Sequence, residues 1–597
     1  MSENKVPYNI LLGGEFLIHE SSVSQTFIPE EFNDGQRMIA NAAHQFIETE
    51  VQPVIDRLEK MEDGLTVSLL NKAGELGLLG TAIPEEYGGY GYDYNTGTFL
   101  LEQVGAGASF AVSLAAHTGI GTLPILYFGT DDQKKKYLPG LASGKIKAAY
   151  CLTEPGSGSD ALAAKTTAMR SADGKHFIIN GQKMWITNGG FADVFIVFAK
   201  IDGDKFSGII VDADTTGVTR GEEEKKMGIK GSSTRQIFFQ DAKVPVENLL
   251  GVAGKGHLIA FNVLNIGRHK LGAAALGASK KVCSMATEYA NQREQFKSSI
   301  GNFGAIKYKL AEMAIRTHAT ETALYRASND IEKMKQHWIS EGLQFHEAMM
   351  TAAEEYAIEC ALLKVFASES LDYVVDENVQ IHGGIGFSEE FPAARAYRDS
   401  RINRIFEGTN EINRLLSVDM LLKRALKGKL DLMKPALAIQ KELMEIPEFS
   451  NDSDYIFNTE RKAISNMKKA FLMTAGSAVQ KLMMQLEHEQ EILMNAADMM
   501  MEIYISESML LRCEKLVQQF GKDSSGLEVD MMKVFINDSI RRVNASGQDA
   551  IAAFAEGDEK KMLLMGLKRF CKWEPINTKN ARRRIADKML SENKFCF

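Results

Sequence analysis

The stretch ADVFIVFAKIDGDKFSGIIVDAD, residues 192–214, decides the fold. Two short apolar runs, rich in Val, Ile and Phe, flank a turn of Asp and Gly. This pattern indicates paired β-strands. Similar runs stand on either side, HFIING at 176–181 and RQIFFQD at 235–241, and no helical segment alternates with them. We therefore expect a β domain at residues 148–252 and disfavour a doubly wound parallel sheet.

Helical patterns lie on both sides of this β domain. Residues 255–378 contain no proline and are rich in Ala, Leu, Lys, Glu and Met, which is the composition of long helices. We expect an antiparallel helical bundle at residues 253–428 and a smaller helical domain at 30–147. Residues 429–597 read as an appended all-α domain. The expected fold class is multidomain and mainly α.

The appended domain contains an apolar stripe at helical spacing. Its members are Ile464, Met467, Phe471, Ala475, Ala478 and Leu482. We expect the stripe to pack onto the rest of the protein; the alternatives are peripheral contact with a membrane and docking of a partner. The charge-free residues 103–130 are long enough for a membrane span, but Gly, Ser, Thr, His117 and Pro124 dilute their hydrophobicity. We expect a helix buried inside the protein there.

Composition excludes several classes of partner and site. The 597 residues hold 69 Lys and Arg against 78 Asp and Glu, a net charge of −9, so nucleic acid is not an expected partner. The six cysteines form no CxxC pair and the eleven histidines are dispersed, so we expect neither disulfides nor a metal. The first residues show no targeting signal, which favours a prokaryotic cytoplasm. Motifs of P-loop kinases, zincins and α/β-hydrolases are absent from the sequence.

The chemistry is concentrated in four separated segments. They are AYCLTEPGSGSD at 149–160, KMWITNGG at 183–190, QIHGGIGF at 380–387 and RIFEGTNEINR at 404–414. The first offers hydroxyls and backbone amides to an anion or cofactor, but is also typical of a surface turn. In the second, Trp185 beside Thr187 could form a wall for a flat heterocycle or belong to the core.

In order and spacing, the four segments resemble the acyl-CoA dehydrogenase flavoprotein family over residues 32–422. The length, the segment AFNVLNIGRHKLGAAALG at 260–277 and the appended domain are similar to its very-long-chain branch. The resemblance implies an N-terminal helical domain, a β-barrel-like middle domain and a C-terminal four-helix bundle, with FAD between sheet and bundle. The implied activity is FAD-dependent α,β-dehydrogenation of long-chain fatty acyl-CoA to trans-2-enoyl-CoA in fatty acid β-oxidation. Electrons would pass to an electron-transferring flavoprotein.

The resemblance also implies the residues that hold FAD. Those at the flavin would be Tyr150, Leu152, Thr153, Ser159, Trp185 and Thr187, the Thr187 hydroxyl reaching N5. Those at the pyrophosphate and adenosine, reached partly from a neighbouring subunit, would be Arg293, Gln295, Phe296, Gln380, Gly383, Gly384, Thr409 and Glu411. Because no monomer could then build a whole site, we expect a homo-oligomer, and the extended branch suggests a dimer.

The catalytic residue that the resemblance implies is Glu407, the base that removes the α-proton while the β-hydride passes to flavin N5. A carboxylate is a weak base for a carbon acid, so we expect burial to raise its pKa. The thioester carbonyl would be polarised by the flavin ribitol 2′-hydroxyl and the Glu407 backbone N–H. Some relatives carry the base at the position of Gly267, which is vacant here. The substrate-binding set would be Ser159, Asn265, Arg268 and Gly408, with Arg268 orienting the site or serving as a buried ion-pair partner.

Two other functions remain open. An acyl-CoA oxidase would share the fold and base but pass electrons to oxygen, and a catalytically idle scaffold or assembly protein would retain only the fold. We expect the enzyme to prefer long acyl chains. The reason is that the small residues Ala115, Ala116, Gly119 and Gly121 leave room for a long acyl chain between helices.

Overall fold

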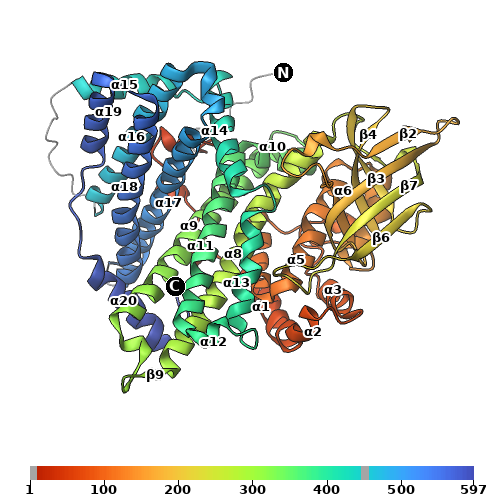
Figure 1. Ribbon diagram of the computed structural model, residues 1–597, viewed down its shortest axis with the longest axis horizontal. Coiled ribbons are helices and arrows are strands. Elements are labelled where there is room, and N and C mark those ends of the chain that lie inside the picture. Colours follow the sequence, from red (N-terminus) through yellow and green to blue (C-terminus); the bar gives the residue numbers. More distant parts are fainter. Residues whose placement is uncertain (1–9, 445–455, 523) are drawn as a thin grey trace.

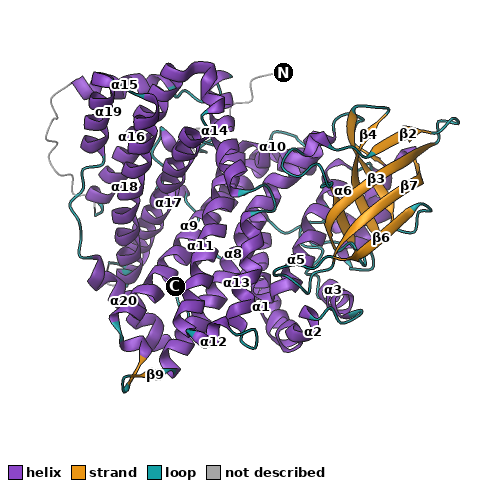
Figure 2. Cartoon of the chain, viewed as in Figure 1, coloured by secondary structure: helices purple, strands orange, loops and turns teal. Residues whose placement is uncertain are grey.

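The computed structural model describes residues 10–444, 456–522 and 524–597. A β-sheet lies at one end of the molecule, the helical bundle in the middle and the appended helices at the other end (Figures 1 and 2). The first helices of the chain lie below the sheet and against the bundle. The architecture is the expected one: an N-terminal helical part, a middle β part, a helical bundle and a further helical region.

The N-terminal part is built of seven α-helices. They are α1 Asp34–Phe46, α2 Ile55–Glu59, α3 Leu65–Glu75, α4 Tyr94–Val104, α5 Ala108–Ala116, α6 Leu123–Phe128 and α7 Asp131–Ala142. Between α5 and α6 the chain forms a π-turn, His117–Gly121, in which Gly119 has non-helical angles of φ −98° and ψ −107°. Within the described residues, the run Tyr94–Phe128 is apolar and long enough to cross a membrane, but 67% of its most apolar window is buried inside the protein. It is a core segment, as the sequence predicted.

The sheet contains the four strands that the sequence predicted and four more. Its members are β1 Ala148–Cys151, β2 Thr167–Arg170, β3 His176–Thr187, β4 Val194–Ile201, β5 Lys205–Asp212, β6 Val218–Glu223, β7 Thr234–Pro245 and β8 Leu249–Leu250. The order is β6-β7-β3-β2-β4-β5-β8, with β1 paired to β4. Most neighbours are antiparallel, while β4 pairs in parallel with β1 and β2. Apolar side chains between Ala149 and Val244 form the core of this domain.

Long helices form the bundle. They are α8 Gly256–Gln292, α9 Gly304–Ser340, α10 Phe345–Glu355, α11 Ala357–His382, α12 Gly384–Phe387, α13 Pro392–Ser400 and α14 Asn410–Leu426. A hairpin of β9 Glu294–Gln295 and β10 Ser298–Ser299 joins α8 to α9. Two glycines let α4 and its following turn lie against α8. A Cβ on Gly277 would come 1.7 Å from the Glu102 carbonyl oxygen, and one on Gly105 would come 2.3 Å from that of Ala274.

The appended helices share one hydrophobic core with the bundle. They are α15 Met433–Met444, α16 Asn458–Leu482, α17 Gln490–Phe520, α18 Gly526–Phe554, α19 Gly557–Phe570 and α20 Thr578–Glu592. In the predicted stripe on α16, Ile464, Met467, Phe471 and Ala478 are buried, and the other two members are half-buried. The stripe therefore packs inside the chain, so it is not the face that would touch a membrane.

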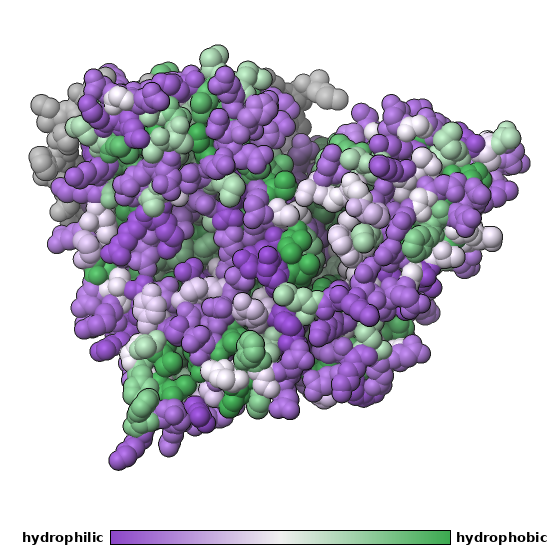
Figure 3. Space-filling model, viewed as in Figure 1, coloured by the Kyte–Doolittle hydropathy of each residue, from purple (hydrophilic) through white to green (hydrophobic). Residues whose placement is uncertain are grey.

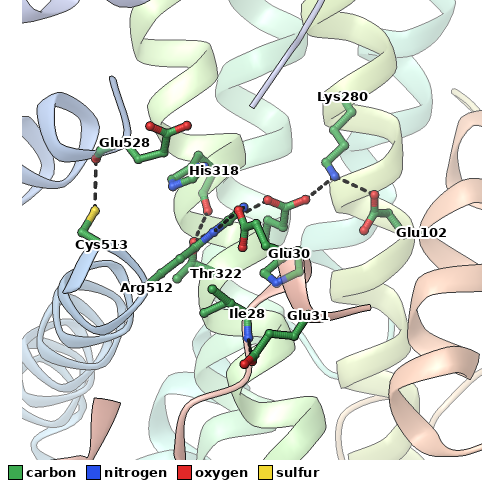
Figure 4. A network of polar contacts seen from close by, with 12 residues as sticks. Ile28, Glu30, Glu31, Glu102, Lys280, His318, Thr322, Arg512, Cys513 and Glu528 are labelled. Atoms are coloured by element: carbon green, nitrogen blue, oxygen red, sulfur yellow. Dashed lines mark hydrogen bonds and ion pairs between the residues drawn. The ribbon is translucent and has the colours of Figure 1, made fainter. Parts of the chain in front are cut away.

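A buried ionic network fastens these parts together (Figure 4). Arg512 of α17 donates from Nη1 to Oε2 of Glu321 on α9 and from Nη2 to Oε1 of Glu30, each at 2.7 Å. Lys280 of α8 forms an ion pair with Glu321 and another, at 2.7 Å, with Glu102 of α4. One chain of charges thus joins the appended domain, the bundle and the N-terminal domain.

Candidate active site

The loop before α14 holds Glu407 in an unusual backbone conformation. Glu407 has φ 58° and Gly408 has φ 80°, both in the left-handed region. A glutamate is strained there, whereas glycine is not. The next residue, Thr409, stops the turn by accepting the Ile412 N–H on its hydroxyl at 3.2 Å, which begins α14. Strain of this kind persists where the surroundings hold it, and it is frequent at functional sites.

Three buried side chains from different helices hold this loop. Lys364 of α11 donates to the Gly408 carbonyl at 2.7 Å, and Asn413 of α14 donates to the same oxygen at 2.8 Å. Arg268 of α8 donates from Nε to the Glu407 carbonyl at 3.3 Å. The position of the carboxylate is therefore set by the bundle rather than by the loop alone.

The Glu407 carboxyl group faces a cavity and is poorly solvated. Its Oε2 is buried and has no hydrogen-bond partner among the described residues. Burial raises the pKa of Glu407 to about 7, although the nearby Arg268 and Lys364 cations act to lower it. A Cβ placed on Gly267 would lie 2.9 Å from Oε2. A side chain at position 267 would therefore collide with the Glu407 carboxylate, and glycine leaves that space open.

Arg268 and Asn265, both predicted to bind the substrate, meet beside this loop. Arg268 was also considered as a buried ion-pair partner. Its side chain is buried and forms no ion pair with any described carboxylate, so the ion-pair interpretation does not hold. Instead Nη1 donates to Asn265 Oδ1 at 2.7 Å, and Glu407 is the nearby anion that acts to raise the pKa of the guanidinium while burial lowers it. The orienting interpretation agrees with this geometry.

The cavity beside Glu407 has a volume of about 350 Å³. The sheet domain contributes Thr187 and Ile229, and one face of α8 from Gly267 to Met285 forms a long wall. The residues of α5 and the π-turn that line the cavity are small or apolar: Ala108, Ala111, Val112, Ala115, Ala116, Gly119 and Ile120. On the surface, the molecule is hollowed between the sheet domain and the bundle (Figure 3).

The expectation for Gly121 was wrong. Gly121 is buried but does not line the cavity, whereas Ala115, Ala116 and Gly119 do. A Cβ on Gly121 would lie 2.9 Å from the Cβ of Ala148 in β1 and 3.1 Å from the Ala116 carbonyl oxygen. This glycine is needed because helix and strand approach closely.

The first two predicted segments lie side by side. The Met184 N–H donates to the Thr153 carbonyl at 2.9 Å, and buried Lys183 donates to the Leu152 carbonyl at 3.1 Å. A bulge between Lys183 and Ile186 gives Trp185 a φ of 57°, and 59% of its surface is exposed. Trp185 is therefore not a core residue, and Thr187 two positions later lines the cavity.

Tyr150 connects the first segment to the fourth. Its hydroxyl is buried and has no hydrogen-bond partner among the described residues. Burial and the nearby Glu407 carboxylate hold the pKa of Tyr150 well above its ordinary value. Further along the same segment, Ser159 is exposed, and beyond Glu407 Gly408 and Thr409 are half-buried and Glu411 exposed.

The remaining predicted residues gather elsewhere, at the lower end of the bundle in Figure 1. The Tyr289 ring of α8 stacks on His382 of α11 at 4.0 Å, so the ends of these helices meet. The exposed residues in this cluster are Arg293, Gln295, Phe296, Gln380, Gly383 and Gly384. None of them lines the Glu407 cavity. Thr409 and Glu411, predicted in the same group as these residues, instead follow Glu407 at the start of α14. This chain therefore divides the predicted pyrophosphate and adenosine residues between two places.

Sequence reasoning missed Lys364 and Asn413. Lys364 is fully buried at the centre of the apolar run CALLKVFA, residues 360–367. A single lysine inside such a run on a long helix has to find a buried acceptor, and that signal was available. Asn413 gave no comparable signal, because its role depends on capping three carbonyls of its own loop.

Comparisons with known proteins agree with this architecture. Residues 33–145, 149–242 and 254–422 match the N-terminal, middle and C-terminal domains of acyl-CoA dehydrogenases, and 466–569 match a second C-terminal domain family of these enzymes. A "Probable acyl-CoA dehydrogenase" of Bacillus subtilis is 47% identical over 98% of both chains. The very long-chain specific acyl-CoA dehydrogenase of rat mitochondria is 40% identical over 65% of this chain and 58% of its own.

A solved structure extends the match to the whole fold. The crystal structure of an acyl-CoA dehydrogenase from Bacillus anthracis, complexed with FAD, superposes with a TM-score of 0.95 at 47% identity. It covers 98% of this chain and all of its own. Because it spans nearly the whole chain, the match includes the appended helices. This chain belongs to the acyl-CoA dehydrogenase family.

Proposed function

We propose that the protein is an FAD-dependent dehydrogenase that converts long-chain fatty acyl-CoA to trans-2-enoyl-CoA. The observation that carries this proposal is Glu407: a carboxylate with an unpartnered buried oxygen, a pKa raised to about 7, and a cavity in front of it. A base poised near neutral pH is what abstraction of an α-proton needs. An idle scaffold has no use for a strained loop held by three buried side chains.

The residues present fit FAD at both predicted places. At the cavity, Thr187 is part of the lining, and Trp185, two residues earlier on β3, is exposed. At the end of the bundle, Gly383 has φ 64° and ψ −139°, and a Cβ on Gly383 or Gly384 would meet nothing within 4 Å. The Phe296 side chain is 90% exposed, and its backbone has a φ of 53°. The described residues therefore leave this aromatic ring almost entirely open to solvent. A second copy of the chain would complete such a site, which supports the proposed homodimer.

In the reaction, Glu407 takes the proton from the α-carbon of the thioester. FAD, when bound, accepts the hydride that leaves the β-carbon. The Glu407 backbone N–H has no acceptor among the described residues, so it is free to donate to the thioester carbonyl as negative charge develops there. Arg268, Lys364 and Asn413 keep the loop in place, so that the carboxylate and the N–H act on one substrate together.

The preference for long chains rests on the length and lining of the cavity. Its α8 wall runs from Gly267 to Met285, which is 19 residues, or about 27 Å of helix. The lining from α5 and the π-turn consists of four alanines, Val112, Gly119 and Ile120, and each methylene buried there contributes up to about 0.8 kcal/mol. For the electron acceptor we propose an electron-transferring flavoprotein, on the family resemblance. Peroxide formed in stoichiometric yield in air would instead identify an acyl-CoA oxidase.

Anaerobic mixing with palmitoyl-CoA tests the proposal. We expect the yellow flavin absorption to bleach rapidly, and Glu407→Gln to slow bleaching by about a thousandfold or more, because the amide cannot take the proton. The amide is nearly isosteric, so FAD content and the unfolding midpoint should match those of the wild type. Wild-type protein that holds FAD but is not bleached by any acyl-CoA would contradict the proposed function.

A further inference from the structure

Lys270 is a half-buried cation without a partner anion among the described residues, and it borders the Glu407 cavity. It lies on the α8 wall one helical turn beyond Gly267, among Leu271, Ala274 and Ala278. Its ammonium donates to the Thr118 carbonyl of the π-turn at 3.3 Å, and it forms no ion pair within the described parts of the chain. An ammonium has three donors, so this contact leaves two of them without a protein acceptor.

The other lysine on this wall shows that the arrangement is not general. Lys281 also lines the cavity, but its ammonium pairs with Glu48 at 2.9 Å. Burial lowers the pKa of Lys270 to about 8, which leaves the ammonium mostly protonated at neutral pH. An uncompensated charge in an apolar wall is costly unless an anion reaches it.

Lys270 lines two cavities, the Glu407 cavity and a smaller one. The smaller space, of about 50 Å³, is lined by Lys270 together with Tyr94, Thr118 and Tyr127. Two charged residues also line it, but both have partners: the Asp93 carboxylate accepts from Thr96, and Lys335 pairs with Glu332. The Tyr94 hydroxyl is buried and has no hydrogen-bond partner in the described residues. Gly119 keeps the approach open, because a Cβ there would meet only the Lys270 side chain, at 3.9 Å. Two unmet donors thus face a small space at the side of the acyl cavity.

Lys270 does not act at the reacting bond. The cations that hold the Glu407 loop are Arg268 and Lys364, whereas the Lys270 ammonium donates to the Thr118 carbonyl of the π-turn. The group that Lys270 meets therefore lies further along the acyl chain. We propose that Lys270 is a specificity-determining residue that binds a carboxylate on the acyl chain, so that CoA esters of dicarboxylic acids are substrates of this enzyme. The inference rests on the proposed function and names a substrate class for it.

The first test compares pairs of substrates of equal carbon number. For each pair, kcat/KM of the ω-carboxyacyl-CoA is divided by kcat/KM of the plain acyl-CoA, from C6 to C16. We expect this ratio to peak at one chain length and to fall at that length by about tenfold or more in Lys270→Met, because a charge-assisted hydrogen bond is lost. Lys270→Arg should keep most of the preference. Lys281→Met, the matched control, should leave the ratio unchanged.

A binding measurement removes chemistry from the test. CoA thioethers lack the carbonyl that acidifies the α-carbon, so they bind without being dehydrogenated. Calorimetry on the FAD-loaded protein should show that Lys270→Met weakens the ω-carboxyalkyl thioether about tenfold more than the plain alkyl thioether. Equal weakening of both, or a ratio that is the same in wild type and Lys270→Met at every length, would overturn the inference.

The two proposals fail in different ways. If palmitoyl-CoA bleaches the wild type but Lys270→Met treats both substrate classes alike, only the role of Lys270 is wrong. If no acyl-CoA bleaches the flavin, the proposed function is wrong whatever the thioethers show.

Discussion

Glu407 shows how one residue obtains its chemistry from its neighbours. Burial raises its pKa to about 7, and two cations, Arg268 and Lys364, limit the rise. Burial also lowers the pKa of Lys364 to about 7, so the two groups titrate in the same range. An apparent pKa measured for the enzyme therefore belongs to the pair.

This pairing predicts a pH dependence. The base must be ionised, so kcat/KM should fall by about tenfold for each unit of pH below about 7. Lys364→Met removes a cation that lowers the pKa of Glu407, so the acidic limb should move to higher pH. The measurement is kcat/KM for palmitoyl-CoA from pH 5.5 to 9. A limb that stays near the ordinary pKa of a glutamate would mean that Glu407 is solvated in the working enzyme.

Gly267 gives a second test at the scale of one residue. A methyl group at this position would lie 2.9 Å from Glu407 Oε2, so the carboxylate has to move. Because small displacements of a catalytic group are costly, Gly267→Ala should lower kcat by about tenfold to a hundredfold while FAD stays bound. Stopped-flow bleaching measures this. Gly476→Ala, where a Cβ has an ordinary contact at 3.5 Å, is the control and should keep the wild-type rate.

At the scale of elements, the longer apolar strands and the long helices could be predicted from the sequence, whereas short strands such as β1 and β8, and polar or strained elements, could not. The predicted runs became β3, β4, β5 and β7. The strand β6, VTRGEE at 218–223, was missed because it lies at the edge of the sheet. Its residues are exposed or half-buried, so it lacks the apolar run that predicted the other strands. The π-turn at His117–Gly121 was also missed, since its shape depends on contacts with α8 rather than on local preference.

The wall formed by α5 predicts how chain length can be changed. Ala115 is helical and lines the cavity, so Ala115→Leu adds bulk without backbone strain. We expect the optimum of kcat/KM to move to shorter acyl chains, with palmitoyl-CoA losing about tenfold or more, because each displaced methylene gives up about 0.8 kcal/mol. Val112→Ala, on the same wall, should shift the optimum the other way. An unchanged chain-length profile in both variants would place the acyl chain elsewhere.

At the scale of the whole molecule, the appended helices are part of the same body as the bundle. The sequence could predict that they are helical and that α16 packs on something, but not on what. Their contacts join residues far apart in the sequence, such as Arg326 of α9 with Glu507 of α17, which lie 181 positions apart and pair at 2.8 Å. Removal of all residues after 428 would therefore uncover the shared core and leave buried charges unpaired.

The ionic network in Figure 4 can be tested by one substitution. Arg512→Met leaves Glu30 without its partner and removes one of the cations beside Glu321. Because these charges are buried, we expect a loss of about 3–5 kcal/mol in the free energy of unfolding. Denaturant unfolding followed by circular dichroism measures it. Lys588→Met breaks an exposed pair with Glu592 and should change stability by less than about 1 kcal/mol.

The same network bears on the order in which the chain assembles during synthesis. The segment before α1 is bound by α16 and α17: Ser21 bonds Glu507, the His19 carbonyl accepts from Lys468, and Glu30 pairs with Arg512. The two ends of such a contact are up to 486 positions apart. At about 5–20 residues per second, a ribosome needs roughly 25–100 seconds to make the intervening chain. The segment at 10–31 therefore leaves the ribosome long before α17 is synthesised, and it cannot form these contacts until then.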